Sequence, residues 1–408
     1  MWRLRSLCAA QTSLWFREAL ASNFNITYKL TPATADKMCV WARRSGTRRF
    51  MLPLLWIFNP RARVLTRYPT PRRYDAIDAA LQTARLRPRA LLDAFNIEVL
   101  ATTNAATDDL SAHAALAAAP GMRGRVVPTF RPDDVSDVAR PGWADAIAKL
   151  SQLTGEKCDT FPSFLAALRL RRAAFAALGA TASDHGAELP VSAPLPAAEA
   201  DSIYRAALRS ASSVSAADAA AFRAHMLMEH ARMSAADGLV MQLHAGVWRN
   251  HDTHLAARFG ADRGGDIPLA ADWTRGLAPL LSELGHAANL TLVAFTLDES
   301  TYARELAPLA GVYPALRLGP PWWFHDSLRG VARYLDSVVE TAGVANLAGF
   351  NDDTRALLSI PARHALWRRA VADWAAEQHA RGVLDWEDAR AVAADLAYHN
   401  AKRTYKLK

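Results

Sequence analysis

The sequence contains few cysteines and no long apolar run. Its 408 residues include three cysteines, Cys8, Cys39 and Cys158, which are far apart and not in Cys-x-x-Cys spacing. This pattern argues against a disulfide framework or a thiolate zinc site and fits a reducing cytoplasm. The longest apolar stretch, residues 50–58, has a proline and is about half the ~20 residues needed to cross a bilayer. We therefore expect a cytoplasmic protein without a membrane span.

Acidic residues are scarce at the start of the chain. Residues 1–73 hold 14 Arg and Lys but only Glu18 and Asp36 as acids, a net charge of +12. Since the whole chain carries +8, the remainder carries −4. We interpret residues 1–75 as an atypical, partly helical basic segment. Its charge is compatible with phosphate contacts to nucleic acid or lipid, with a targeting peptide, or with translation in a shifted frame. On balance we expect the protein to have neither a nucleic-acid nor a membrane partner.

The body lacks a Gly-rich dinucleotide loop and internal repeats, and it alternates short apolar runs with longer helical stretches. Strands that alternate with helices are typical of parallel strands joined by right-handed crossovers. Seven such units favour closure into a barrel, so we predict a TIM-type (β/α) barrel over residues 76–408. The expected strands are 97–103, 125–130, 179–183, 239–244, 290–297, 313–318 and 346–350.

Two helix starts are indicated by capping residues. Ser215 with Asp218 and Asp385 with Asp388 have the spacing at which a side chain caps the backbone N–H three residues on. Residues 186–199 are rich in Pro and Ala, and we expect a surface loop there that leads into the next helix.

Polar side chains recur where the expected strands end. Because the loops after parallel strands converge on one face of a barrel, we expect these side chains to lie together there. The successive strand ends carry Thr102-Thr103-Asn104, Arg131, Asp184-His185, His244, Asp298, Trp322-Trp323 and Asp352-Asp353, with Arg355 two residues further on. Their recurrence beside apolar strand interiors indicates an active site.

Each of these residues also has an ordinary structural explanation. An aspartate after a strand is often a helix N-cap, which applies to Asp184 and Asp353. Arg131 can pair with a nearby aspartate, a single histidine such as His244 is often a hydrogen-bonded structural residue, and Trp322 can simply pack. The joint pattern favours the active site over these separate explanations.

The chemistry that suits this set is the handling of a small polyhydroxylated acid. Arg131 and Arg355 can clamp a carboxylate with their planar donor forks. His244 can move a proton near neutral pH. Asp184 and Asp353 can accept protons from hydroxyls or bind a divalent metal. A tryptophan face packs well against a sugar ring.

Several collinear stretches at these positions resemble the uronate isomerases (glucuronate/galacturonate isomerases), a branch of the amidohydrolase superfamily. The resemblance spans about three quarters of the chain. It is carried by FNIEVLATTNAATDDLSAH (95–113), VVPTFRPDD (126–134), SDHGAEL (183–189), VMQLHAGVWRN (240–250), PPWWFHD (320–326), GFNDDTRALLSIPARHALWRR (349–369) and AYHNAKR (397–403).

This resemblance implies a metal-dependent amidohydrolase barrel that interconverts an aldose uronic acid and its ketose. The implied pairs are D-glucuronate with D-fructuronate and D-galacturonate with D-tagaturonate, in uronate catabolism. Carried over by motif, it implies Asp353, His244 and Asp184 as catalytic residues, Arg131, Arg355, Trp322 and Arg249 as substrate-binding residues, and Asp353 as a metal ligand. Possible homo-oligomers are compatible with the resemblance.

The sequence departs from the family's pattern at its first strand. That strand ends in His-x-His, which supplies two metal ligands, and no His-x-His occurs in these 408 residues. We therefore expect a barrel without the first strand, and a divalent metal, zinc by preference, bound more weakly than a site of about three protein ligands would bind it. The alternatives are an inactive truncated barrel remnant and, less favoured by the tryptophans and arginines, metal-assisted hydrolysis.

Overall fold

A computed structural model of the chain describes residues 79–261, 265–321, 325, 327–354 and 357–407. These residues form two compact units, one of 79–100, 110–127 and 352–367 and the other of 101–109, 128–351 and 368–407. The basic segment 1–75 lies outside the described residues. Its separation from a catalytic domain at 76–408 therefore stays a prediction.

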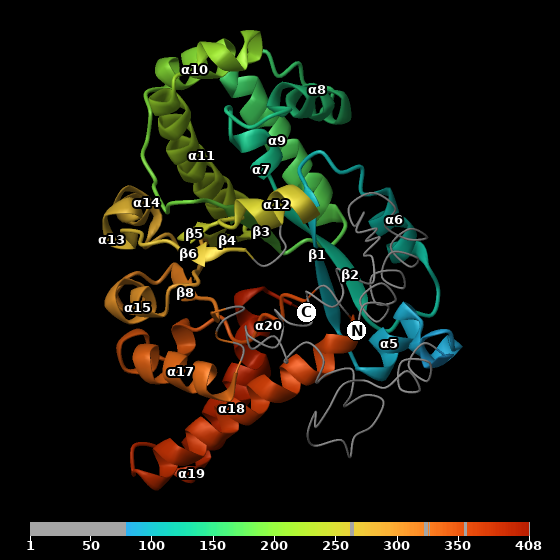
Figure 1. Ribbon diagram of the computed structural model, residues 1–408, viewed down its shortest axis with the longest axis vertical. Coiled ribbons are helices and arrows are strands. Elements are labelled where there is room, and N and C mark those ends of the chain that lie inside the picture. The colour runs from blue at the N-terminus through green and yellow to red at the C-terminus, as the bar shows by residue number, and fades with distance from the viewer. Residues whose placement is uncertain (1–78, 262–264, 322–324, 326, 355–356, 408) are drawn as a thin grey trace. The chain divides into compact units, whose positions relative to one another are not determined.

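A six-stranded sheet organises the fold, and its strands are paired in the order β1-β2-β3-β4-β7-β8. Figure 1 shows the sheet strands with helices around them. Every neighbouring pair from β2 to β8 is parallel. Parallel order with a helical connection after each strand is the arrangement of a (β/α) barrel, as the sequence predicts. The strands are β1 (Val99–Ala105), β2 (Arg125–Arg131), β3 (Ala182–Gly186), β4 (Val240–His244), β7 (Leu292–Phe295) and β8 (Leu316–Leu318).

Three strand expectations need correction. The expected strand 346–350 is reduced to one bridge, between Leu347 and Leu318, because residues Val344–Asn346 form a 3-10 turn instead. The strand expected at 179–183 lies at Ala182–Gly186, so Asp184 stands inside β3 rather than after it. A short antiparallel hairpin of β5 (Val247–Trp248) and β6 (Ile267–Pro268) was not expected.

The helices fill the connections between strands, and both predicted caps are confirmed. The Ser215 hydroxyl accepts the backbone N–H of Asp218 at 3.1 Å, and Asp385 accepts that of Asp388 at 2.7 Å. The helices are α5 (Pro88–Ala94), α6 (Ser111–Ala118), α7 (Asp133–Ser136), α8 (Trp143–Thr154), α9 (Phe161–Ala177), α10 (Ala197–Arg209), α11 (Ala216–Asp237), α12 (Thr253–Phe259), α13 (Trp273–Gly276), α14 (Ala278–Leu284), α15 (Glu299–Thr301), π-helix η4 (Tyr302–Leu306), α16 (Ala307–Val312), α17 (Leu328–Ala342), α18 (Ile360–Ala380), α19 (Trp386–Ala394) and α20 (Asn400–Thr404).

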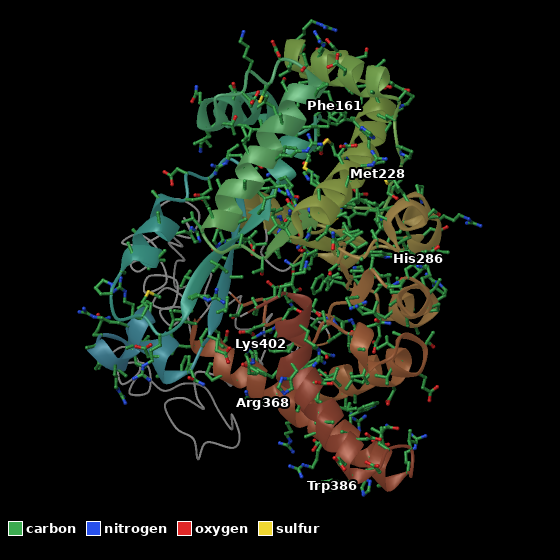
Figure 2. The ribbon with its side chains drawn as sticks, turned by 180° about the vertical axis from the view of Figure 1, so that it is seen from behind. Phe161, Met228, His286, Arg368, Trp386 and Lys402 are labelled. Carbon is green, nitrogen blue, oxygen red and sulfur yellow. The ribbon has the colours of Figure 1, made fainter. Side chains whose placement is uncertain are left out.

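Aromatic side chains hold the helices between β2 and β4 together. Phe161, which Figure 2 labels at the start of α9, packs its ring against Phe222 of α11 with centroids 5.5 Å apart. Phe164 stacks on Tyr204 of α10 at 5.1 Å. Aromatic pairs in these geometries contribute about 0.5–1.5 kcal/mol each beyond their buried area.

A separate apolar cluster lies on the sheet itself. It combines Ala182, Val240 and Val293 from three neighbouring strands with Phe295 and Tyr405. Because side chains alternate along a strand, these residues share one face, and His185, Leu243 and other intervening residues face the opposite way. The smaller unit has its own core around Leu92, Leu116 and Val126.

The described residues bear in part on two expectations, that the cysteines form no disulfide framework and that no segment spans a membrane. Cys158 is a buried free cysteine, and burial raises the pKa of its thiol to about 11. Cys8 and Cys39 lie outside the described residues. No helix within the described ranges is long and apolar enough to cross a membrane.

Candidate functional site

Arg131, Asp184 and His244 are brought together in the larger unit, as the strand-end pattern predicts. The Asp184 carboxylate accepts a hydrogen bond from Arg131 Nη1 at 2.9 Å with one oxygen. Its other oxygen lies 2.7 Å from Nδ1 of His244. One buried carboxylate therefore joins the arginine of β2 to the histidine of β4.

Strand register explains why these side chains meet. Phe130 of β2 is level with Ser183 of β3, so the next residues, Arg131 and Asp184, are level as well. On β4, His244 is level with Gly186, two residues after Asp184 on the same face of β3. The pairing of three adjacent parallel strands thus sets the distance between the ionisable groups.

The electrostatics of the cluster centre on Asp184, whose side chain is only 7% exposed. Burial by itself would raise the pKa of this carboxyl. His244 and Arg131 outweigh burial and hold the pKa well below its usual range. Asp184 is therefore a permanent anion across the physiological range.

Asp133, which was not among the predicted site residues, completes the cluster. It accepts Arg131 Nε at 2.7 Å and the backbone N–H of Gly186 at 3.1 Å. A Cβ on Gly186 would lie 2.7 Å from Arg131 Nη2 and 2.8 Å from Asp133 Oδ2, so a larger residue there would have to displace the ends of this ion pair. Burial raises the pKa of Asp133 although Arg131 opposes it. The signal was present in the motif Arg131-Pro132-Asp133, where the ordinary pairing of Arg131 was already an alternative.

His244 has partial access to solvent, although Arg131 and Asp133 at the edge of the cluster are more exposed, at 31% and 23%. Its side chain is 18% exposed, against 7% for Asp184. Its ring stacks on Phe295 of β7, with centroids 4.4 Å apart and planes 8° from parallel. In the neutral ring, a carboxylate acceptor at Nδ1 favours the Nδ1–H tautomer, which leaves the lone pair on Nε2.

A second polar layer lies behind the cluster, on the helix side of β3. The rings of His185 and His230 of α11 are 4.7 Å apart. His185 Nε2 bonds the Ser183 hydroxyl and His230 Nε2 the Ser136 hydroxyl, both at 2.9 Å. Burial lowers the pKa of His185 to about 3 and that of His230 well below its usual value, with the positive charge of Arg172 contributing to both shifts. Both histidines are neutral at pH 7, and this buried network supports the strand that carries Asp184.

A second missed group lies on the same sheet face as Asp184. The Tyr405 hydroxyl donates to the Gln242 amide oxygen at 2.8 Å and accepts from Asn351 Nδ2 at 2.7 Å. Burial raises the pKa of Tyr405 above its usual value, so its hydroxyl stays protonated. The only sequence signal was its place just after the motif at 397–403.

Arg249 is not part of the cluster among the contacts that the structure describes. It follows β5 and donates to Asp266 at 2.8 Å. The Asp266 carboxylate is completely buried and also accepts the backbone N–H of Asn250 at 2.9 Å. This pair has a structural explanation, since it ties the two ends of the β5–β6 excursion together.

The strand-end pattern also included Trp322, Asp353, Arg355 and Asp298. Trp322 and Arg355 lie outside the described residues. Asp353 is an exposed residue of the smaller unit with a left-handed backbone, φ 45°. Its neighbour Asp352 pairs with Arg363 at 2.5 Å. Asp298 is the helix cap that the ordinary reading allows, since it accepts the backbone N–H of Ser300 at 2.9 Å.

A metal fits the described residues poorly. In the part of the chain that the structure describes, no three or more His, Cys, Asp or Glu side chains are grouped so that they could hold a metal ion. Both oxygens of Asp184 are already engaged by Arg131 and His244. The cluster instead suits acid–base work, because it presents a partly exposed imidazole whose orientation is set by a permanent anion.

Comparisons with known proteins agree on one family. A family model described as glucuronate isomerase matches residues 51–405. The uronate isomerase of Phenylobacterium zucineum is 50% identical over 334 residues, which are 82% of this chain and 69% of that protein. The crystal structure of glucuronate isomerase from Caulobacter crescentus superposes with a TM-score of 0.80 at 43% identity, covering 87% of this chain and 74% of that one. The uronate isomerase structure from Thermotoga maritima gives 0.83 at 25% identity, covering 97% and 87%.

Proposed function

The chain belongs to the glucuronate isomerase family, and from this premise we propose that Arg131, Asp184 and His244 form the acid–base part of its active site. As a uronate isomerase it interconverts an aldose uronic acid and the matching ketose. We propose D-glucuronate with D-fructuronate and D-galacturonate with D-tagaturonate as the pairs. The observation that carries the residue assignment is the Asp184 carboxylate held between Arg131 and His244 at 2.9 and 2.7 Å.

Aldose–ketose isomerisation moves a proton between C2 and C1 through an enediol-like intermediate. It needs a group that exchanges protons near neutral pH, a stabiliser of the developing oxyanion and a firm hold on the distant carboxylate. In our proposal His244 exchanges the proton through Nε2. Asp184 keeps the ring in the required tautomer and stabilises its protonated form. Arg131 keeps Asp184 ionised.

The substrate-binding assignments rest on the family motifs. We propose that Arg355 and Arg131 face the substrate carboxylate and that Trp322 packs against the sugar. Arg131 Nε and Nη1 are engaged by Asp133 and Asp184, so its contribution is a fixed positive charge more than a two-point clamp. Arg249 is the weakest of these assignments, because its pair with Asp266 already explains it.

The family is metal-dependent in general. We propose that this chain takes a divalent metal, with zinc first, through Asp353. Binding is expected to be weak, because the sequence has no His-x-His and the described residues do not group three ligands. No step of the proposal above is assigned to the metal. We also propose a cytoplasmic location, with a homo-oligomer as one possible assembly.

The deciding experiment is an assay of the purified chain with D-glucuronate and with D-galacturonate, with and without added zinc or manganese. Turnover that disappears in Asp184→Asn and His244→Gln but persists in Asp298→Asn supports the proposed site. The last variant is a matched control, because Asp298 also stands at a strand end but caps a helix. No turnover of either uronate by a folded chain, with any added metal, would instead favour the inactive remnant.

A further inference from the structure

The ring of Phe295 fills the space beside the His244 imidazole. The two residues are level on the adjacent parallel strands β4 and β7, so their side chains point to the same face. The rings are nearly parallel, 8° apart in plane, with centroids 4.4 Å apart. Phe295 is only 3% exposed, and its carbonyl accepts the backbone N–H of Ala245 at 3.2 Å. The phenyl ring is therefore stacked on one face of the imidazole.

The opposite side of the Phe295 ring is closed by the backbone of Gly319. A Cβ at this position would lie 2.1 Å from Cε1 and 2.3 Å from Cδ1 of the phenyl ring, so any side chain there would have to displace the ring. Gly319 itself cannot move away easily. Its N–H donates to the Ala294 carbonyl at 3.0 Å, and its carbonyl accepts the buried Tyr302 hydroxyl at 2.8 Å. The phenyl ring is therefore held between a fixed backbone and the imidazole.

Two described contacts of His244, with Asp184 and with Phe295, restrain different motions of its ring. The hydrogen bond from Nδ1 to Asp184 fixes one ring atom at 2.7 Å but leaves rotation about that bond. The flat contact with Phe295 opposes this rotation, and so it determines where Nε2 points. A negatively polarised ring face also favours the protonated imidazole. Proton transfer depends steeply on direction and distance, and a misplacement of about 1 Å costs ~100-fold in rate.

We infer that Phe295 is a positioning residue that sets the plane of the His244 imidazole, and that residue 319 must be glycine because the phenyl ring occupies the space of its side chain. This inference rests on the proposed role of His244. It adds two residues, from β7 and the end of β8, that act on the reaction through His244 and without touching substrate. Contacts then connect residues of five neighbouring strands across one face of the sheet, in the order Arg131, Asp184, His244, Phe295 and Gly319.

The test compares substitutions that keep or remove the aromatic face. Phe295→Leu is expected to lower kcat by about 10- to 100-fold with KM nearly unchanged, whereas Phe295→Tyr keeps the face and most of kcat. Gly319→Ala, which displaces the phenyl ring, should reproduce the kcat loss of Phe295→Leu. Phe164→Leu is the matched control. It removes an equally buried phenyl ring of the same unit, in α9 and away from His244, and should leave kcat unchanged.

A spectroscopic measurement tests the geometry without activity. Protons that lie over an aromatic face are shielded, so the ring proton signals of His244, identified by their absence in His244→Gln, should lie upfield in the wild-type chain. They should stay upfield in Phe295→Tyr and return to ordinary positions in Phe295→Leu. Ordinary positions in the wild type would overturn the inference even if Phe295→Leu does not fold.

The outcomes separate this inference from the proposed function. Unchanged turnover in His244→Gln refutes the assignment of His244, and the positioning role falls with it. Loss of turnover in His244→Gln together with unchanged kcat in Phe295→Leu refutes the positioning role alone. A rise in KM at unchanged kcat in Phe295→Leu also refutes it, because a residue that aims a catalytic group acts on the chemical step.

Discussion

Replacing the buried histidine of β3 by glutamine should remove a defined part of the protein's acid sensitivity. His185 is 5% exposed, and its Nε2 bonds the Ser183 hydroxyl at 2.9 Å. Glutamine places an amide group at about the position of that nitrogen, but it does not titrate. His185→Gln therefore tests the protonation of this site while retaining a polar partner for Ser183.

The magnitude follows from the difference in pKa between the two states. The pKa of His185 is about 3 in the folded chain, against 6.5 for an unperturbed histidine. Between these values the unfolded chain binds a proton that the folded chain does not, so stability falls as pH drops below 6.5. Integration from pH 8 gives a loss of about 0.8 kcal/mol at pH 6 and ~2 kcal/mol at pH 5 from this one residue.

The assay is urea unfolding, followed by circular dichroism, of wild type and variant at pH 8, 6 and 5. The variant is expected to lose less stability between pH 8 and pH 5 than the wild type, by about 2 kcal/mol. His286→Gln is the matched control, because this histidine is exposed at the surface (Figure 2). The free energy of unfolding of His286→Gln should vary with pH as that of the wild type does.

The protonation of His185 affects only the part of the difference in unfolding free energy that changes with pH. A glutamine that packs less well lowers stability by the same amount at every pH and leaves the comparison intact. Parallel curves for wild type and His185→Gln from pH 8 to pH 5 would show that the buried histidine is protonated in the folded chain as easily as in the unfolded one. The burial argument for this network would then be wrong.

Three further predictions concern the site and the frame around it. Asp184→Asn should lower kcat by about 10²- to 10⁴-fold, because the amide no longer fixes the tautomer of His244. Steady-state kinetics of this variant and of the control Asp298→Asn measure the effect, and equal kcat values in the two variants would contradict it. Arg249→Ala should lower the free energy of unfolding by about 1–3 kcal/mol with little change in KM, because the Asp266 carboxylate stays buried without its arginine. A raised KM at unchanged stability would instead indicate that Arg249 binds the substrate. Asp385→Ala should cost about 1 kcal/mol through loss of the cap of α19 and leave kcat unchanged, which thermal unfolding and an activity assay decide together.

Several features of the molecule follow from the sequence because their causes are local. The caps at Ser215 and Asp385 depend on residues three positions apart, and both form as predicted. Apolar runs that alternate with helical stretches predict parallel strands, because a helix that crosses over the sheet returns the chain to the edge at which the previous strand began. The expected meeting of Arg131 with Asp184 needs only the rule that the ends of parallel strands share one edge.

Other features were decided by contacts between residues far apart in the chain. The limits of β3 depend on the neighbours it pairs with, so Asp184 stands inside a strand that propensity alone ends one residue earlier. The sequence offered Asp133 as a local partner of Arg131, but it did not reveal that Arg131 binds Asp133 and Asp184 at once, or that Asp266 holds Arg249. Charges pair by distance in space, and sequence spacing carries little of that information beyond one helical turn.

The family and the meeting of Arg131, Asp184 and His244 were thus accessible from the sequence, because motifs and strand ends are properties of short segments. The support of that site was not. The sequence separates His185 from His230 by 45 positions and Phe295 from Gly319 by 24. The two residues of each pair meet only because strand register and helix packing bring them together. Tertiary structure therefore decided what packs against His244, because those contacts join different strands, while the sequence by itself determined the family and placed His244 at a strand end, because motifs and strand ends are local.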